Sequence, residues 1–484
     1  MDPNELLVNL YDKKSIIAIE NLAIKDFNIS NAYLEQKVVS CCVEQLSKTF
    51  PLAQKIAVFC GIGNNAQDGL KIADKLQSMG FVVQIIKAID WTKELQLDAD
   101  VIVDALFGIG INRHITGVWE HIIYQINDSN IPVFSIDIPS GLDPDTGKVL
   151  GVAIKAKVTI TFVGLKKGLF TGKGREHSGE IRFNNLGLPI DAYKHAVCNV
   201  VRLNSNNFNN ILPRRVAFAH KGNFGKLLII GGKDGMQGAA YLAGIAALRS
   251  GSGIVYVLSN SSNQSSFHNS CPEIQWHNFS EIKQLKELIA KSTVILLGPG
   301  LGHDKYSKIL FDEVMQSDLP LVLDADGLNM LAEKFNNNFK IRKNWILTPH
   351  SGEAAKLLNI DVAAVDADRF AAVEELSHKF KATVVLKGSG TLIKSYQDNR
   401  EYNPVYLCDL GNPGMATAGM GDVLAGLIAA LLAQKLTLKD AARFAVFTHA
   451  LAGDLVAQNG SLGILASDLI LFIRKIINDF HKIS

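Results

Sequence analysis

The stretch GNPGMATAGMGDVLAG, Gly411 to Gly426, carries five glycines and passes directly into an apolar helical pattern that runs to Leu432. Glycine adopts backbone conformations that are closed to other residues, and the free amides at the start of a helix point together at one spot. Such a spot binds phosphate. Asp422 stands where this helix should begin, so its carboxylate could take a proton from a hydroxyl that approaches a bound phosphoryl group. A structural interpretation stays open, because Asp is a common helix N-cap and a glycine-rich turn can be only a tight loop.

Three other glycine-containing segments follow predicted strands in the second half of the chain. They are LGPGLG (Leu297–Gly302), TPHSGE (Thr348–Glu353) and LKGSGT (Leu386–Thr391). Ligands of open α/β sheets collect at the carboxyl ends of the strands, so we expect these segments and the Asp422 turn to converge on one crevice. The lysine and the hydroxyls of the third segment suit nucleotide phosphates.

Several of these side chains also have a purely structural interpretation. His350 can be a core or capping histidine, and Glu353 can be an exposed carboxylate after a turn. Asp324 and Asp326 can merely end a strand and start a turn. Two common nucleotide-binding motifs are excluded: Gly168–Lys173 lacks the Walker A spacing, and no G-x-G-x-x-G follows the first strand of the second half.

The composition is that of a globular enzyme with two domains. A chain of 484 residues is too long for one hydrophobic core, and 48% of its residues are hydrophobic. The net charge of +2 gives no long-range field for capturing nucleic acid or an anionic membrane. The six cysteines form no C-x-x-C pair, so we expect no zinc site and reduced thiols in a cytoplasmic protein. The acidic N-terminus is unlike a signal peptide, and the longest apolar run, Val423 to Ala433, is too short to span a membrane.

Short β-branched runs alternate with helical patterns, which predicts a three-layer α/β domain in each half of the chain. Residues 14–50 look helical. The asparagine-rich segment 204–210 is too polar to pack into a core, so we place the boundary there and expect domains 1–210 and 211–484. The expected strands are Ile56–Cys60, Phe81–Ile86, Val101–Ala105, Val133–Asp137 and Val158–Phe162 in the first domain, and Lys226–Ile230, Ile254–Leu258, Thr293–Leu297, Leu321–Asp324, Trp345–Thr348 and Thr383–Leu386 in the second.

The first domain has polar groups at three of its strand ends. The turn Gly61–Gly69 follows one strand, Asp104 lies near the end of another, and Asp137 and Ser140 follow a third. Any strand-to-helix turn favours Gly, Asn and Asp, so the first of these signals is weak by itself. Amide, carboxylate and hydroxyl oxygens from the three loops could together surround a monovalent cation.

The second half resembles the ADP/ATP-dependent NAD(P)H-hydrate dehydratase family, which has a ribokinase-like fold. The resemblance rests on His220-Lys-Gly, GMQGA (Gly235–Ala239), LGPGLG, LDADGLN (Leu323–Asn329), TPHSGE, LKGSGT and GNPGMATAGMGD, in this order. It implies that a hydrated nicotinamide cofactor, NADHX or NADPHX, is phosphorylated on its ring hydroxyl by ADP or ATP with Mg²⁺, and that phosphate then leaves. It implies Asp422 as the substrate-binding base, nucleotide contacts at Lys387, Gly388, Ser389, Gly390, Thr391 and Gly421, and substrate contacts at Ala239, Gly300 and His350.

The first half resembles the NAD(P)HX epimerase domain, a Rossmann-like fold, through DALFGIG (Asp104–Gly110) and DIPSG (Asp137–Gly141). This resemblance implies K⁺ at Asn65, Asp104 and Ser140, and proton chemistry at Asp137. The implied substrate contacts are Asn64, Asn65, Ala66, Gln67, Asp68, Gly108, Ile109, Gly110, Ile111, Asn112, Arg113, His114 and Asp137.

The sequence departs from the epimerase pattern in two places. Ala66 and Gln67 stand where the family usually has two glycines, and Lys37 and Val38 stand where Ala-Gly is usual. The departures leave a second hypothesis open, in which the first domain is a non-catalytic cofactor-binding scaffold.

The alternatives for the second domain are enzymatic. A vitamin kinase of the same fold would phosphorylate a hydroxymethyl group and stop there. The sequence does not choose between ADP and ATP, although the fusion of the two domains favours ADP by family habit. Apolar helices in both halves could form contacts between copies of the chain, so we expect a homo-oligomer.

Overall fold

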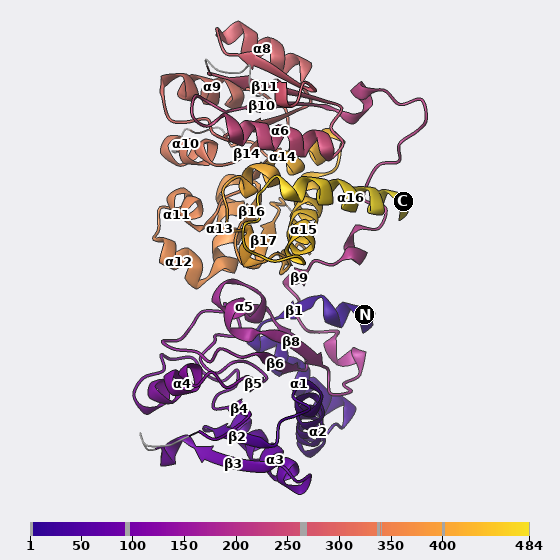
Figure 1. The fold of residues 1–484 in the computed structure, drawn as a ribbon. Helices are drawn as coiled ribbons and strands as arrows, with labels where there is room; N and C mark the ends of the chain where they lie inside the picture. The colour runs from indigo at the N-terminus through magenta and orange to yellow at the C-terminus, as the bar shows by residue number, and fades with distance from the viewer. Residues whose placement is uncertain are drawn as a thin grey trace. The chain divides into compact units, whose positions relative to one another are not determined.

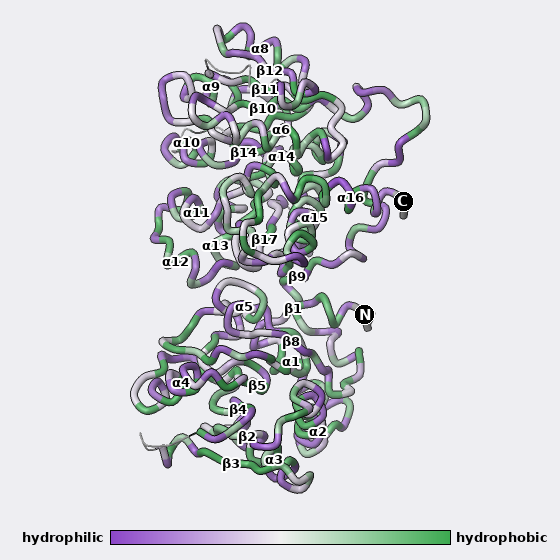
Figure 2. Tube along the Cα trace, viewed as in Figure 1, coloured by the Kyte–Doolittle hydropathy of each residue, from purple (hydrophilic) through white to green (hydrophobic). Residues whose placement is uncertain are grey.

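Apolar runs of sequence form a mainly parallel sheet in each half of the chain, so the predicted α/β fold is confirmed (Figure 1). The computed structural model describes residues 3–91, 97–261, 269–335, 339, 341–398 and 402–483. They form two compact units, Met1–Arg202 and Leu203–Ser484. Hydrophobic residues mark the central strands of both units (Figure 2). None of the helices in the described ranges combines the length and the hydropathy that a bilayer-spanning segment needs.

The first unit contains a six-stranded parallel sheet in the order β3-β2-β4-β5-β6-β8. The chain reverses direction across the sheet between β2 and β4, and doubly wound sheets bind ligands at such a switch point, beyond the carboxyl ends of the strands. A short ladder pairs β1 with β7 and β9. The strands are β1 (Asn9–Tyr11), β2 (Lys55–Cys60), β3 (Val82–Lys87), β4 (Val101–Ala105), β5 (Val133–Ile136), β6 (Val158–Phe162), β7 (Leu165–Lys166), β8 (Glu180–Asn184) and β9 (Val200–Arg202), and the helices are α1 (Lys13–Phe27), α2 (Asn31–Thr49), α3 (Asn64–Ser78), α4 (Val118–Asp128) and α5 (Gly172–Ser178).

In the second unit the sheet runs in the order β12-β11-β10-β13-β14-β15-β16-β17-β18. The strands from β12 to β16 are parallel, and β17 and β18 continue the sheet antiparallel. The strands are β10 (Lys226–Ile230), β11 (Ile254–Ser259), β12 (Ile274–Asn278), β13 (Val294–Leu297), β14 (Leu321–Leu323), β15 (Trp345–Leu347), β16 (Thr383–Leu386), β17 (Thr391–Lys394) and β18 (Val405–Cys408). The helices are α6 (Gln237–Arg249), α8 (Ile282–Lys291), α9 (Lys305–Met315), α10 (Asp326–Lys334), α11 (Ser351–Leu358), α12 (Val362–Ala367), α13 (Arg369–Phe380), α14 (Met420–Ala433), α15 (Leu438–Ala457) and α16 (Asp468–Ile483).

Small residues let helices of the second unit approach one another closely. α6 and α14 pack so tightly that a Cβ added at Gly426 would lie 2.2 Å from the backbone oxygen of Ala243. Together with α15 and α16 they share one hydrophobic core with the sheet, and Figure 1 shows α9, α10 and α11 on the other side of this sheet. Helix α14 is thereby fixed along its length, and its first turn lies at the carboxyl edge of the strands.

The expectation that segment 204–210 cannot pack into a core is wrong. Phe208 in this segment is fully buried and packs against the rings of Phe444, Phe447 and Phe480. The aromatic ring outweighs the polarity of its asparagine neighbours, so the segment belongs to the core of the second unit, which begins at Leu203.

We predict that Gly426→Ala lowers the free energy of unfolding of the second unit by about 1–3 kcal/mol, because the added methyl forces α14 away from α6. The matched control is Gly238→Ala on α6, where a Cβ would meet nothing within 4 Å and should change stability by no more than about 1 kcal/mol. Thermal and urea denaturation measure both. Equal midpoints for the two variants would contradict the close packing of these helices.

Candidate functional site

The carboxyl ends of four neighbouring strands meet at one edge of the second sheet. β13, β14, β15 and β16 are parallel neighbours, so the segments that follow them lie together. Lys387, directly after β16, donates a hydrogen bond from Nζ to Oδ1 of Asp324, directly after β14, over 2.8 Å. Thr348, after β15, donates from Oγ1 to the same oxygen over 2.7 Å. Asp324 therefore joins three strand ends in one buried network and does more than end a strand.

Glu353 is buried beside this pair, so the interpretation of it as an exposed carboxylate is wrong. Its side chain is 7% exposed, and its Oε2 lies 3.8 Å from Nζ of Lys387. His350 caps helix α11, because its Nδ1 accepts hydrogen bonds from the backbone amides of Gly352 and Glu353 over 3.0 and 3.3 Å. The imidazole is still 61% exposed. The capping role therefore leaves part of the ring open to a ligand.

The start of helix α14 lies against the same ion pair. A Cβ added at Gly421 would lie 3.4 Å from Nζ of Lys387 and 3.8 Å from Oδ2 of Asp324. Asp422 follows in the first turn and is half-buried. Burial, and after it the charge of Asp324, raises the pKa of Asp422 to about 7, while Lys387 acts in the opposite direction. A carboxylate with this pKa can take up and release a proton near neutral pH.

Positive charge and free amides gather at this spot. Burial by itself lowers the pKa of Lys387, but the carboxylates of Asp324 and Glu353 outweigh burial and raise it above its usual value. Lys387 is therefore an ammonium at neutral pH. At Gly419, with φ +88°, no side chain of the described residues caps helix α14, so the amides of its first turn are available to an anion.

Two further loops form another wall of the site. Ala325 has φ +47°, which is uncommon for a residue with a side chain, and the following Asp326 accepts a hydrogen bond from the amide of Gly302 over 2.7 Å. Gly300 has φ +60°, and a Cβ there would lie 3.3 Å from Cβ of Ala239. The structure thus brings together Ala239 and Gly300, the two small residues that the sequence predicts as substrate contacts.

The predicted nucleotide loop, Lys387–Thr391, is held by an arginine that the sequence analysis missed. Arg369 on α13 is buried and donates from Nη2 to the carbonyls of Leu386 and Lys387, each over 3.2 Å. A Cβ added at Gly388 would lie 3.0 Å from the same nitrogen. The arginine and the loop are separate in sequence and meet only in the fold, so no local pattern could indicate this contact.

In the first unit, the three predicted cation ligands come together at the switch point of the sheet. Asp104 accepts hydrogen bonds from Oγ of Ser140 at Oδ1, over 2.6 Å, and from Oγ of Ser135 at Oδ2, over 2.9 Å. The carbonyl of Phe107 lies 3.2 Å from Oγ of Ser140 and accepts a hydrogen bond from Nδ2 of Asn65 over 3.0 Å. Asp104, Ser140 and the carbonyl of Phe107 therefore form one hydrogen-bonded group, which Asn65 joins through its amide nitrogen.

Asp137 lies at the end of the next strand, β5, with φ +69°. Its Oδ1 forms an ion pair with Lys166 and accepts a hydrogen bond from the amide of Phe162 over 3.2 Å. The side chain of Asp137 is 19% exposed, whereas that of Lys166 is 1% exposed. Lys166 is a second residue that the sequence analysis missed.

The predicted segment Gly108–His114 lines a cavity of about 420 Å³ next to this edge, except for Ile109, which packs against the core. In the turn that departs from the epimerase pattern, the methyl group of Ala66 is buried in the core, whereas Asn64 and Gln67 are exposed. The side chain added at position 66 therefore points into the core, and Gln67 is the added side chain that stays exposed.

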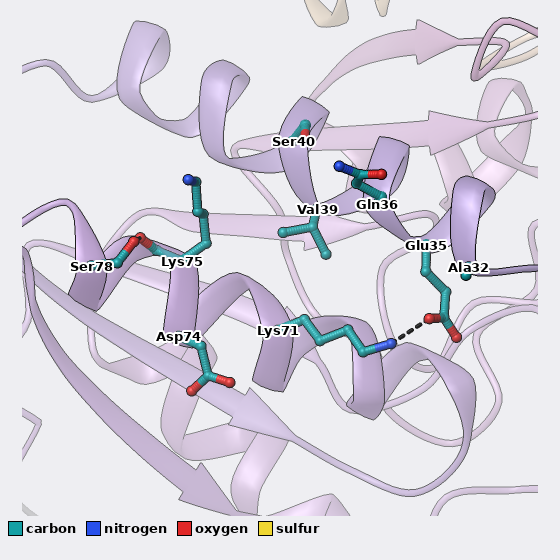
Figure 3. A pocket seen from close by; sticks show the side chains of 9 residues that line it. All are labelled: Ala32, Glu35, Gln36, Val39, Ser40, Lys71, Asp74, Lys75 and Ser78. Carbon is teal, nitrogen blue, oxygen red and sulfur yellow. Dashed lines mark hydrogen bonds and ion pairs between the residues drawn. The ribbon is translucent and has the colours of Figure 1, made fainter.

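A separate hollow of about 520 Å³ lies between α2 and α3 (Figure 3). It is crossed by an ion pair between Lys71 and Glu35, and none of the predicted site residues lines it. Both charged groups act on nearby Asp68: burial raises the pKa of Asp68 to about 6, Glu35 contributes in the same direction, and Lys71 opposes it. The hollow belongs to the helical layer and not to the strand ends.

Comparisons with known proteins agree with this arrangement. The family model for NAD(P)H-hydrate dehydratase matches residues 227–475, and the model for the YjeF-related protein N-terminus matches residues 82–168. A bifunctional NAD(P)H-hydrate repair enzyme of Coxiella burnetii is 38% identical, over 97% of this chain and 99% of that protein. The repair enzyme of Escherichia coli is 36% identical, over 89% of this chain and 86% of that protein. A ribokinase-like superfamily protein from Enterococcus faecalis superposes with a TM-score of 0.53 at 27% identity, over 59% of this chain and 97% of that chain.

The full-length match distinguishes between the hypotheses drawn from the sequence. A vitamin kinase would account for the second unit alone, whereas the two repair enzymes above match both units. The resemblances found in the sequence are therefore confirmed, and the chain belongs to the family of bifunctional NAD(P)H-hydrate repair enzymes.

Proposed function

We propose that the second unit dehydrates the S form of NADHX or NADPHX, with Asp422 as the base for the ring hydroxyl. The observation that carries this proposal is the position of Asp422 in the first turn of α14, with a pKa of about 7 and beside the Lys387–Asp324 pair. Asp422 takes the hydroxyl proton, the freed oxygen bonds to the terminal phosphorus of the nucleotide, and the bond between that phosphorus and the rest of the nucleotide breaks, so that AMP leaves when ADP is the donor. Phosphate then departs from the ring with the electrons of the carbon–oxygen bond, the neighbouring ring carbon loses a proton so that the ring double bond forms, and NAD(P)H is restored.

The nucleotide binds, on this proposal, between the Lys387–Thr391 loop and the start of α14. Lys387 and the amides near Gly421 supply positive charge where negative charge moves during phosphoryl transfer. Ala239, Gly300 and His350 form the side that holds the hydrated nicotinamide. ADP is the proposed donor, giving AMP as product, and the comparison of ADP with ATP as sole donor tests this choice.

The described residues fit Mg²⁺ only as an ion carried by the nucleotide. Within the described ranges, no three His, Cys, Asp or Glu side chains gather into a metal cluster. Mg²⁺ is commonly bound through one or two carboxylates together with substrate phosphates and water. Asp324 and Glu353 are the carboxylates nearest to Lys387, and when bound the ion would neutralise phosphate charge beside them.

The first unit is proposed to interconvert the R and S forms of the same cofactor, with Asp137 moving the proton and K⁺ held by Asn65, Asp104 and Ser140. The fit of a cation rests on Asp104. It is fully buried, burial raises its pKa, and no lysine or arginine in the described part of the chain pairs with it. Buried carboxylates are normally compensated by charge, and a weakly hydrated cation would supply it here.

The proposed compartment is the cytoplasm. Cys41, Cys42, Cys60 and Cys271 are free thiols, which supports a reducing compartment such as this one.

The proposed assembly is a homo-oligomer. Three exposed apolar side chains lie close in sequence, namely Leu462 and Leu465 before α16 and Leu471 on it. They support contacts between copies of the chain.

We predict that Asp422→Asn lowers kcat for dehydration of S-NADHX by about 100- to 10,000-fold, the usual contribution of a general base. The epimerase rate and the thermal midpoint should not change, because the substitution keeps the shape of the side chain. Asp312→Asn on α9, at a carboxylate that is 56% exposed and paired with Lys334, is the matched control and should retain full activity. Retained dehydratase activity in Asp422→Asn would end the assignment.

The pH dependence of dehydration follows from the same pKa. A base acts in its deprotonated form, so kcat/KM should rise with pH and level off above about 7. Asp324→Asn removes a negative charge and releases the ammonium of Lys387, and both changes favour the ionised form of Asp422. The rise should therefore move to lower pH, and a rise that stays in place or moves upward would contradict the electrostatic assignment.

The cation site can be tested without a rate measurement. KCl at constant ionic strength should raise the thermal midpoint of the first unit in the wild type, because binding to the folded state stabilises it. Asp104→Asn removes the compensated charge and should abolish this increase. Ser129→Ala, on the turn after α4, removes a hydroxyl that bonds only locally and should keep the K⁺ response. An equal response in wild type and Asp104→Asn would exclude Asp104 as a ligand.

A further inference from the structure

Lys166 is a buried lysine whose ammonium group donates hydrogen bonds to side-chain and backbone oxygens of the first unit. Its Nζ donates hydrogen bonds to Oγ1 of Thr161 and to the carbonyl of Phe162, each over 2.9 Å, and to Oδ1 of Asp137. Three acceptors match the three N–H groups of an ammonium. The side chain is 1% exposed, so it cannot reach a substrate in the cavity directly.

Two strained turns bring this lysine to Asp137. Asp137 has φ +69°, and the amide of Ile138 bonds to the carbonyl of Ile136 over 2.8 Å. Val163 has φ +66°, and the amide of Gly164 bonds to the carbonyl of Phe162 over 2.7 Å. Both are γ-turns centred on a residue with a side chain, a rare and strained geometry. Backbone strain of this kind destabilises the fold and concentrates at functional positions.

The two carboxylate oxygens of Asp137 differ in their hydrogen bonds. Oδ1 accepts hydrogen bonds from Lys166, from the amide of Phe162 over 3.2 Å and from Oγ1 of Thr161 over 3.4 Å. No hydrogen bond from the described residues reaches Oδ2. The carboxylate is 19% exposed, so one oxygen is fixed from the inside and the other is left for a ligand.

The other titratable groups that face this pair are acids. Glu20 from α1 and Asp68 from α3 interact with Asp137, and burial raises the pKa of both, that of Asp68 to about 6. Cys42 from α2 is a buried thiol whose pKa burial raises well above its usual value. Lys71, at the far side of Asp68, already pairs with Glu35. Lys166 therefore supplies the positive charge at the centre of this acidic group.

We propose that Lys166 is a positioning residue of the epimerase, which binds Oδ1 of Asp137 and thereby presents Oδ2 to the substrate as the proton-transferring oxygen. This inference rests on the proposed role of Asp137. Lys166 acts through Asp137 and does not touch the substrate, so its loss should lower kcat and leave KM nearly unchanged.

The test follows R-NADHX conversion to the S form by chromatography, with the full chain and no nucleotide, so that dehydration is silent. Lys166→Met should lower the enzymatic kcat by about 100-fold, the scale of a misplaced catalytic group, with KM changed less than about twofold. Methylammonium or ethylammonium should restore part of the rate in Lys166→Ala, which a merely structural lysine would not allow. Dehydratase activity of the same preparations, measured with S-NADHX and ADP, reports that the second unit is intact.

Three outcomes would decide against the inference or its basis. Full epimerase activity in Lys166→Met, or a loss confined to KM, would overturn the positioning role. Should Lys166→Met not fold, Thr161→Val keeps both charges and removes one acceptor of the ammonium; it should lower kcat by roughly tenfold, and an unchanged kcat would overturn the inference. Full activity in Asp137→Asn would instead refute the proposed role of Asp137.

Discussion

The ion pair between Lys387 and Asp324 is the interaction on which the site of the second unit depends. Asp324 is 2% exposed, and a buried carboxylate is costly unless hydrogen bonds and an opposite charge compensate it. Lys387 and Thr348 provide that compensation from two neighbouring strands. Because each of these residues directly follows a strand, the pair also fixes how the strand ends lie relative to the start of α14. Burial raises the pKa of Asp422 into the neutral range, the charge of Asp324 adds to this effect, and Lys387 opposes it.

The first unit also has to compensate the charge of buried carboxylates, and it does so with different partners. It also places carboxylates at the ends of neighbouring strands. Asp104 is the second-last residue of β4, and Asp137 directly follows β5. Asp137 has a lysine from within its own unit, whereas Asp104 has only hydroxyl and amide donors. This difference is the physical reason for assigning proton chemistry to one carboxylate and cation binding to the other. In both units a residue with a side chain takes a positive φ at the site, Ala325 in the second and Asp137 in the first.

Local patterns in the sequence predicted the strands and the edge of the sheet at which the site lies. The apolar runs gave the strands almost residue by residue, for example Val101–Ala105 and Thr383–Leu386, because burial on both faces requires consecutive apolar residues. Glycine-rich strand ends gave the edge of the sheet at which the site lies. Burial within that edge was not predictable: Glu353 follows a turn as an exposed carboxylate would, and only the fold places it beside Lys387.

The residues that the sequence analysis missed act across long distances in the chain. Arg369 and Lys166 lie in unremarkable helical and strand patterns, and their partners are brought to them by the sheet. Phe208 shows the converse, because one aromatic residue reverses the expectation drawn from its polar neighbours. Charge compensation at a buried site is a property of the assembled fold, and a single sequence contains no periodic signal for it.

The central claim is that burial and the charges around Lys387 and Asp324 hold Asp422 ready to exchange a proton at neutral pH. The most direct measurement is a pH titration of the Asp422 side-chain carboxyl by ¹³C NMR in the ligand-free protein, with Asp422→Asn to assign the signal. We expect a midpoint of about 7. A midpoint of about 4, the ordinary value for an aspartate, would contradict the claim.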